Sequence, residues 1–120
     1  MGNPLPKNMF KGTLGELFVQ IRLLEYGVQA ARPLRDTGND LIAIRGKVIK
    51  CIQVKTGNDP KKPKPQKIYD LMAIVKLKEK NGSVLNNESK ISIGHKNDER
   101  KNYRELTQEL VDKIWKNGKS

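Results

Sequence analysis

Two β-rich runs joined by a two-residue turn constrain the fold of this chain more than any other feature of its sequence. Residues 41–45 and 48–55 are rich in aliphatic residues, and only Gly46 and Lys47 separate them. Glycine at the first central position suits a type II′ turn, whose twist matches that of the two strands of a hairpin. The sequence therefore predicts an antiparallel hairpin with a defined register.

That register places polar side chains together. If Arg45 faces Val48, Asp40 faces Gln53, and facing residues of an antiparallel pair have Cβ atoms about 4.5–5.5 Å apart. Lys55 stands on the face of Gln53, about 7 Å further along the strand. Two oxygen ligands beside an ammonium group suit a hard cation such as Mg²⁺ or Mn²⁺. The competing interpretation is an ordinary polar outer face of a sheet, with Lys55 in water.

The remainder of the chain predicts a single α/β (α+β) domain, because 120 residues leave no room for a second core. The expected elements, from the N-terminus, are an arm over residues 1–11, a helix over 13–26, strands over 28–32, 41–45 and 48–55, a basic loop over 56–67, a helix over 67–80, a strand over 90–94 and a closing helix over 103–116. For 67–80 a strand over 69–75 is the alternative, since that run is also apolar. A lone helix before three strands favours a mixed sheet flanked by helices, with a further helix at the C-terminus.

The first helix carries an apolar stripe that we expect to face the core. Its members follow one another at spacings of three and four: Leu14, Leu17, Phe18, Ile21 and Leu24. Glu16 lies to the side of this stripe, where it could reach a site at the edge of the helix. Its alternative role is in a capping box of the form S/T-x-x-E with Thr13. Trp115, in the closing helix, either completes the core or contacts a second copy of the chain.

The charge of the chain indicates a polyanionic partner. The formal net charge is +11, so nucleic acid is the first partner to consider and an anionic membrane surface the second. No apolar run is long enough to span a membrane, the first residues do not form an apolar leader, and one cysteine cannot form an intrachain disulfide. We therefore expect a cytoplasmic protein. The candidate phosphate contacts are Lys47, Lys50, Lys61, Lys62, Lys64 and Lys67.

Three short segments resemble the PD-(D/E)xK nuclease superfamily, which includes Holliday-junction resolvases and homing endonucleases. They are Gly15-Glu16, the segment Gly38-Asn39-Asp40-Leu41-Ile42-Ala43, and the segment Ile52-Gln53-Val54-Lys55-Thr56. The resemblance covers most of the chain and rests on the order and spacing of a few residues. It implies a restriction-endonuclease-like α-β-β-β-α-β core.

The resemblance also implies which residues form the active site. Catalytic residues would be Glu16, Asp40, Gln53 and Lys55. The metal would be held by the carboxylates of Glu16 and Asp40, the side-chain carbonyl of Gln53 and the backbone carbonyl of Val54. Gln53 departs from the family, which more often has a carboxylate there. Asp36 would replace Asp40 as a ligand if the hairpin had another register.

The function implied is that of a Mg²⁺-dependent endodeoxyribonuclease, a hydrolase that cuts phosphodiester bonds in duplex or branched DNA. One site per chain implies a homodimer or larger homo-oligomer for cutting both strands. The alternative is a non-catalytic nucleic-acid-binding module with a degenerate nuclease fold, which Gln53 keeps open. A third hypothesis is a small basic structural or ribonucleoprotein component.

Overall fold

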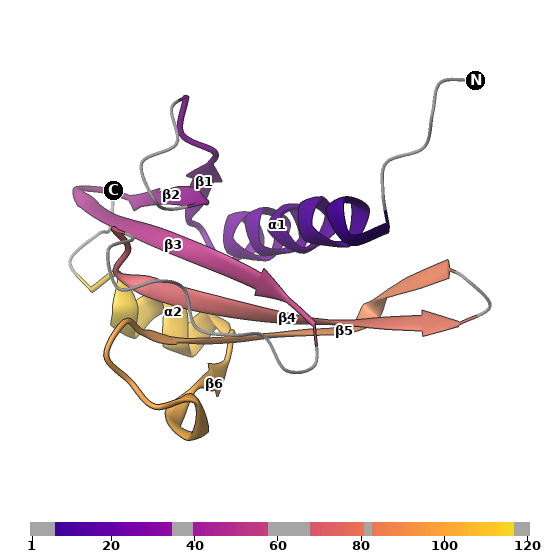
Figure 1. Cartoon of the computed structure of the whole chain (residues 1–120). Coiled ribbons are helices and arrows are strands. Elements are labelled where there is room, and N and C mark those ends of the chain that lie inside the picture. The colour runs from indigo at the N-terminus through magenta and orange to yellow at the C-terminus, as the bar shows by residue number, and fades with distance from the viewer. Residues whose placement is uncertain (1–6, 35–39, 58–67, 81–82, 117–120) are drawn as a thin grey trace.

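The chain forms a mixed sheet with helices packed against it. The computed structural model describes residues 7–34, 40–57, 68–80 and 83–116. Its elements are α1 (Lys7–Glu25), β1 (Gln29–Ala31), β2 (Leu41–Arg45), β3 (Val48–Thr56), β4 (Leu71–Lys80), β5 (Ser83–His95), the 3₁₀ helix η1 (Arg100–Asn102), β6 (Arg104–Glu105) and α2 (Gln108–Ile114) (Figure 1). The predicted α+β class, with a mixed sheet and a C-terminal helix, is confirmed. No helix in the described ranges combines the length and hydropathy that crossing a membrane requires.

The six strands lie in the sheet in their sequence order, β1-β2-β3-β4-β5-β6. Every neighbouring pair is antiparallel except β3 with β4, which is parallel. A parallel pair requires a crossover, and the chain between Thr56 and Leu71 provides it. Strands β4 and β5 continue as a two-stranded ribbon beyond the other strands (Figure 1).

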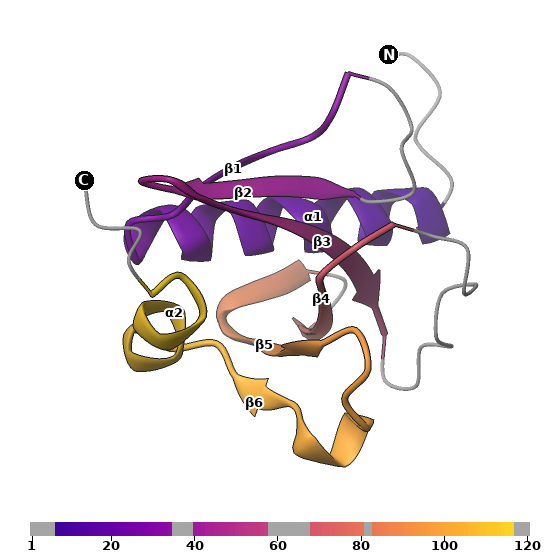
Figure 2. The same cartoon turned by 90° about the vertical axis from the view of Figure 1, so that its left-hand side faces the viewer.

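One apolar cluster joins the sheet to both helices. Residues of β2, β3, β4 and β5 that share one face belong to it, together with Val19 and Leu23 of α1, Val111 of α2 and Trp115 at the end of α2. Both helices therefore cover the same face of a curved sheet, and α2 lies near the C-terminal end of α1 (Figure 2). Trp115 is fully buried and completes this core.

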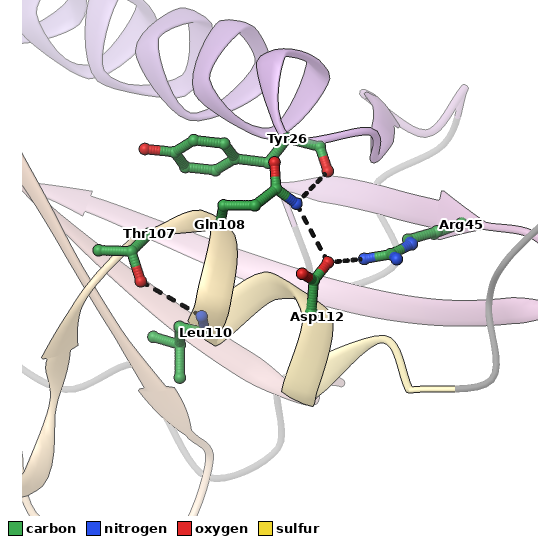
Figure 3. Close-up of polar contacts among 6 residues, drawn as sticks. All are labelled: Tyr26, Arg45, Thr107, Gln108, Leu110 and Asp112. Carbon is green, nitrogen blue, oxygen red and sulfur yellow. Dashed lines mark hydrogen bonds and ion pairs between the residues drawn. The ribbon is translucent and has the colours of Figure 1, made fainter.

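Polar contacts hold α2 in place at the edge of this core (Figure 3). Gln108 Nε2 donates to the carbonyl oxygen of Tyr26 at 3.0 Å, and Arg45 Nη1 donates to Asp112 Oδ1 at 2.7 Å. The hydroxyl of Thr107 caps the helix by accepting from the N–H of Leu110. These contacts tie the closing helix to α1 and to the β2–β3 hairpin.

The predicted helix over 67–80 is wrong, because residues 71–80 form strand β4. The strand alternative over 69–75 is the closer prediction. Residues 71–75 are all buried, which a strand between two neighbours achieves when both of its faces are covered. An amphipathic helix would bury only one of its sides. The apolar spacing of this run is compatible with such a helix and with a buried strand, so spacing alone did not decide between them.

Other element boundaries also differ from the predictions. The first helix begins at Lys7, inside the expected arm. Strands β1, β2 and β3 confirm the strands expected over 28–32, 41–45 and 48–55, and the strand expected over 90–94 is the last part of β5. The closing helix is shorter than 103–116, because β6 precedes it and α2 begins at Gln108.

The face that α1 turns to the sheet is not the predicted one. Gly15, Val19 and Leu23 are buried, whereas Leu17, Ile21 and Leu24 of the predicted stripe are 47%, 55% and 67% exposed. Phe18 alone of that stripe packs against the core cluster. The physical reason is the close approach of Gly15 to Thr56 of β3, since a Cβ on residue 15 would overlap the Thr56 hydroxyl. Glycine lets the helix backbone rest on the sheet, and this contact sets the rotation of α1.

Replacing Gly15 with alanine should therefore destabilise the protein by about 1–3 kcal/mol, the usual cost of overpacking. Gly12→Ala is the matched control, because a Cβ there meets nothing within 4 Å and alanine favours a helix over glycine by about 1 kcal/mol. Urea denaturation of both variants measures the two changes. Equal stabilities of the two variants would contradict the proposed contact.

Candidate functional site

The hairpin has the predicted register. Arg45 pairs with Val48 and Leu41 with Ile52, so Asp40 comes directly before the last pair, on the Gln53 side. The N–H of Asp40 donates to the carbonyl oxygen of Ile52 at 3.0 Å. Strand β2 begins at Leu41, which pairs with Ile52, whereas β3 runs on to Thr56. The last residues of β3 therefore have no partner in β2.

Asp40 closes this open edge of β3 with its side chain. The N–H of Val54 donates to Asp40 Oδ2 at 2.9 Å. The carboxylate thus takes the place of the backbone carbonyl that a longer β2 would offer. Asp40 is therefore held directly against β3, between the core-facing residue Val54 and the opposite face that carries Gln53 and Lys55.

Glu16 reaches the same end of β3 from α1. It follows Gly15, which rests on Thr56, and its side chain is 17% exposed. Burial and the nearby charge of Asp40 raise the pKa of Glu16, and Arg32 partly offsets them. Glu16 Oε1 lies 3.3 Å from Arg32 Nε, an ion pair without hydrogen-bond geometry.

The capping-box interpretation of Glu16 is wrong. It requires Thr13 to be the residue at which the helix begins, and α1 begins at Lys7. Thr13 and Glu16 are both inside the helix. The position of Glu16 against β3 therefore needs another explanation than the cap.

Gln53 does not lie on a solvated outer face. It is 3% exposed, and its Oε1 has no hydrogen-bond partner in the described part of the chain. Glu16 Oε1 and Thr56 Oγ1 are likewise buried without a hydrogen-bond partner there. Glu16 Oε1 and Thr56 Oγ1 lie on the side of β3 that α1 covers, whereas Gln53 belongs to the opposite face. Buried oxygen atoms are nearly always satisfied, so these unsatisfied ones indicate places for water or a cation on both sides of this end of β3.

The donor set at this end of β3 fits a hard cation held loosely. It offers two carboxylates, a neutral amide oxygen and backbone carbonyls, which are the ligands that Mg²⁺ accepts while it keeps several waters. No group of three or more His, Cys, Asp or Glu side chains suited to a metal occurs within the described ranges. A tight structural metal centre of those ligands is therefore not what these residues build. Lys55, half-buried, is two residues beyond Gln53 on the same strand face.

The lysines predicted to contact phosphate do not gather at this end of β3. Lys47 is exposed in the hairpin turn, and Lys50 pairs with the core residue Ala43, so both lie toward the far end of β3 from Gln53. Lys61, Lys62, Lys64 and Lys67 lie outside the described residues, as does Asp36. Neither Lys47 nor Lys50 shares the face of Lys55 near the site.

Two lysines that the sequence did not single out share the sheet face of Lys55. Lys55 pairs with Ile74, and the next residue of β4 on that face is Lys76, which pairs directly with Lys90 of β5. Both are exposed. The alternation of Lys76, Lys78 and Lys80 is the signal that could have found this set, and the helix prediction for the segment obscured it.

Two further polar residues near these elements do not join the site. Gln20 Nε2 donates to the carbonyl oxygen of Ala30 at 3.2 Å and links α1 to β1. Cys51 is half-buried, and burial followed by the charge of Asp70 raises the pKa of its thiol, which makes it a poor nucleophile. Arg32, which the sequence did not single out, is the cation beside Glu16.

Changing Asp40 should separate its structural from its electrostatic role. Asp40→Ala leaves the Val54 N–H without its acceptor, so it should cost about 1–3 kcal/mol of unfolding free energy. Asp40→Asn keeps an acceptor oxygen and removes the charge, so it should cost clearly less. Urea denaturation measures both variants. Equal losses would contradict the assigned role of the Oδ2–Val54 hydrogen bond.

The raised pKa of Glu16 predicts a stability that depends on pH. A carboxyl whose pKa is raised by folding favours the folded state below its unfolded pKa, and this contribution is lost as pH rises through the folded pKa. Glu16→Gln should therefore raise the melting temperature at neutral pH without divalent cations, and the gain should shrink in acid. Glu105→Gln, at an exposed carboxylate of β6, is the control. A gain from Glu16→Gln that is constant with pH would show that the charge of Glu16 does not cause it.

Comparison with known proteins supports the fold alone. No family model matches this sequence, and no curated protein matches it. The structure is similar to that of a bacterial homing endonuclease, I-Ssp6803I, with a TM-score of 0.55 and 14% sequence identity over 96% of this chain and 100% of that chain. The chain therefore has a nuclease-like fold.

Proposed function

We propose that this protein is a metal-dependent DNA endonuclease that hydrolyses phosphodiester bonds in duplex or branched DNA. One observation carries the proposal: in a nuclease-like fold, buried oxygens of Glu16 and Gln53 without hydrogen-bond partners accompany the carboxylate of Asp40 at one end of β3. An ordinary structural site would satisfy these oxygens internally. The Gln53 oxygen is available to a cation, and Glu16, which pairs with Arg32, would exchange that ion pair for the metal.

Glu16, Asp40, the side-chain carbonyl of Gln53 and the backbone carbonyl of Val54 would hold Mg²⁺ or Mn²⁺. When bound, the cation supplies positive charge that polarises a phosphodiester and lowers the pKa of a water molecule. Asp40 is kept in position by the Val54 N–H. Gln53, being neutral, leaves the site with one negative charge fewer than a carboxylate would. Glu16 must be ionised to act as a ligand, so its raised pKa limits cation binding in acid.

Lys55 is the residue that we assign to the phosphate. An ammonium group beside the scissile phosphodiester stabilises the charge that develops on its oxygens and orients the attacking water. Its position two residues from Gln53 keeps it close to the cation ligands. The residue as a whole is half-buried, which restricts the conformations of its side chain.

The lysines on the same face support a DNA substrate. Like charges directly opposite one another across a strand pair are destabilising, and Lys76 faces Lys90 in this way. Phosphates from a bound duplex would relieve this repulsion, which water and salt only screen. Together with the net charge of +11, this pair favours a polyanion near Lys55. Lys47, Lys50, Lys61, Lys62, Lys64 and Lys67 remain further candidate phosphate contacts.

Cleavage by variants at the site tests the proposal. The wild type should nick or cut plasmid or four-way DNA with Mg²⁺ or Mn²⁺ and stop on chelation. Lys55→Ala should lower the cleavage rate by roughly 10²–10³-fold with little change in DNA affinity. Lys76→Ala is the matched control: cleavage should persist, and the log–log salt slope of binding should fall by about 0.9.

Gln53→Glu completes this test, because it restores the commoner ligand and should retain activity. If the wild type and Gln53→Glu are both inert on linear, nicked and branched DNA with either cation, the nuclease function is wrong. DNA binding without cleavage would then identify the non-catalytic binding module.

A further inference from the structure

Helix α1 is apolar on two opposite sides. Gly15, Val19 and Leu23 form its buried row, spaced at four residues along the helix. The exposed residues Leu17 and Ile21 are each two positions from Val19, which at about 100° per residue places them on the far side of the helix. Their exposed fractions are 47% and 55%, and Leu24 beside them is 67% exposed. A surface helix normally carries polar residues there, so this side needs a separate explanation.

The outer apolar residues have the spacing of a helix–helix contact. Leu14, Leu17, Ile21 and Leu24 follow one another at three, four and three residues, and we call them the apolar seam. This alternation is that of the a and d positions of a coiled coil, and it differs from the four-residue spacing of the buried row. The apolar seam is therefore not a by-product of packing α1 on the sheet.

We propose that the apolar seam is the interface of a homodimer in which α1 packs antiparallel against α1 of a second copy. Two chains of charge +11 repel one another, so they can meet only where the surface is close to neutral. Residues 11–25 are neutral overall, because Lys11 and Arg22 balance Glu16 and Glu25. The apolar seam lies on this neutral segment.

The flanking charges select the antiparallel arrangement. Lys11 and Glu25 are two heptads apart and so lie on the same flank of the apolar seam, one near each end. An antiparallel pair with a two-fold axis places Lys11 of each copy beside Glu25 of the other, so the contact forms twice. A parallel pair keeps these opposite charges at opposite ends.

A hollow beside the apolar seam gives room for a side chain of the partner. It has a volume of ≈ 280 Å³ and lies between α1 and β1, lined by Gln20, Ile21, Leu24, Gln29 and Ala30. Knobs-into-holes packing needs such a space next to each a or d residue. A leucine from the seam of the second copy has the size and the apolar character to enter it.

This interface is formed by α1 and the neighbouring part of β1, and only its use rests on the proposed nuclease function, because two copies supply two sites, one for each DNA strand. Its test therefore needs neither DNA nor metal. Size-exclusion chromatography with light scattering, from low micromolar to near-millimolar protein, should give a dimer for the wild type and a monomer for Ile21→Glu. Ile49→Glu is the matched control, because Ile49 on β3 is 59% exposed and should leave the dimer intact.

Because Ile21 and Ile49 are exposed, both variants should remain folded and melt cooperatively. Ile21→Glu should lose only the stabilisation that dimerisation adds, which grows with protein concentration. A monomeric wild type at the highest concentration would overturn the proposal. So would a folded Ile21→Glu variant that remains dimeric, or a dimer that only Ile49→Glu disrupts.

Exchanging the flanking charges tests the orientation. Lys11→Glu and Glu25→Lys should each raise the dimer dissociation constant several-fold, measured by sedimentation velocity, since each places like charges together. The double variant should return the constant close to that of the wild type. Failure of the double variant to recover would overturn the antiparallel arrangement.

Discussion

The register of the β2–β3 hairpin is the constraint on which the rest of the structure depends. Gly46 adopts φ 59° in the turn, a left-handed conformation that glycine adopts without strain. A shift of one residue would turn every side chain of β3 to the other face, exposing Ile52 and burying Lys55. With the observed register, β2 begins one residue after Asp40, and the side chain of Asp40 can accept from the N–H of Val54. The last residues of β3 have no partner in β2, so Glu16 can approach this edge.

The parts of this architecture that could be predicted are those that local chemistry decides. The turn residues and the two β-rich runs define the hairpin within one short stretch of chain, so its register followed from the sequence. Strand β4 was not predictable in the same way. Its buried run 71–75 fits a helix or a strand equally until the neighbours β3 and β5 are known, because they supply the hydrogen bonds along both of its edges.

The roles of the candidate site residues stay a prediction, and the sequence could not supply the details of their surroundings. Spacing and resemblance pointed to Glu16, Asp40, Gln53 and Lys55, yet they could not show that Gln53 is buried or that Arg32 pairs with Glu16. The prediction of which side of α1 faces the core was wrong for a different reason. A helix with two apolar sides has no unique inward face by periodicity, and only the missing side chain of Gly15 distinguishes the side that rests on β3.

Helix α1 thereby links the two proposals. Its inner side brings Glu16 to the end of β3, and its outer side carries the apolar seam. In the antiparallel dimer, the midpoint of the seam falls near Val19, so the two-fold axis passes within one helical turn of Glu16 in each copy. The two sites would then lie on the outer sides of the helix pair and be related by the two-fold axis. A rotation of α1 that buried the seam instead would remove Glu16 from β3 and the proposed dimer contact together, so the close approach of Gly15 to Thr56 holds both arrangements in place.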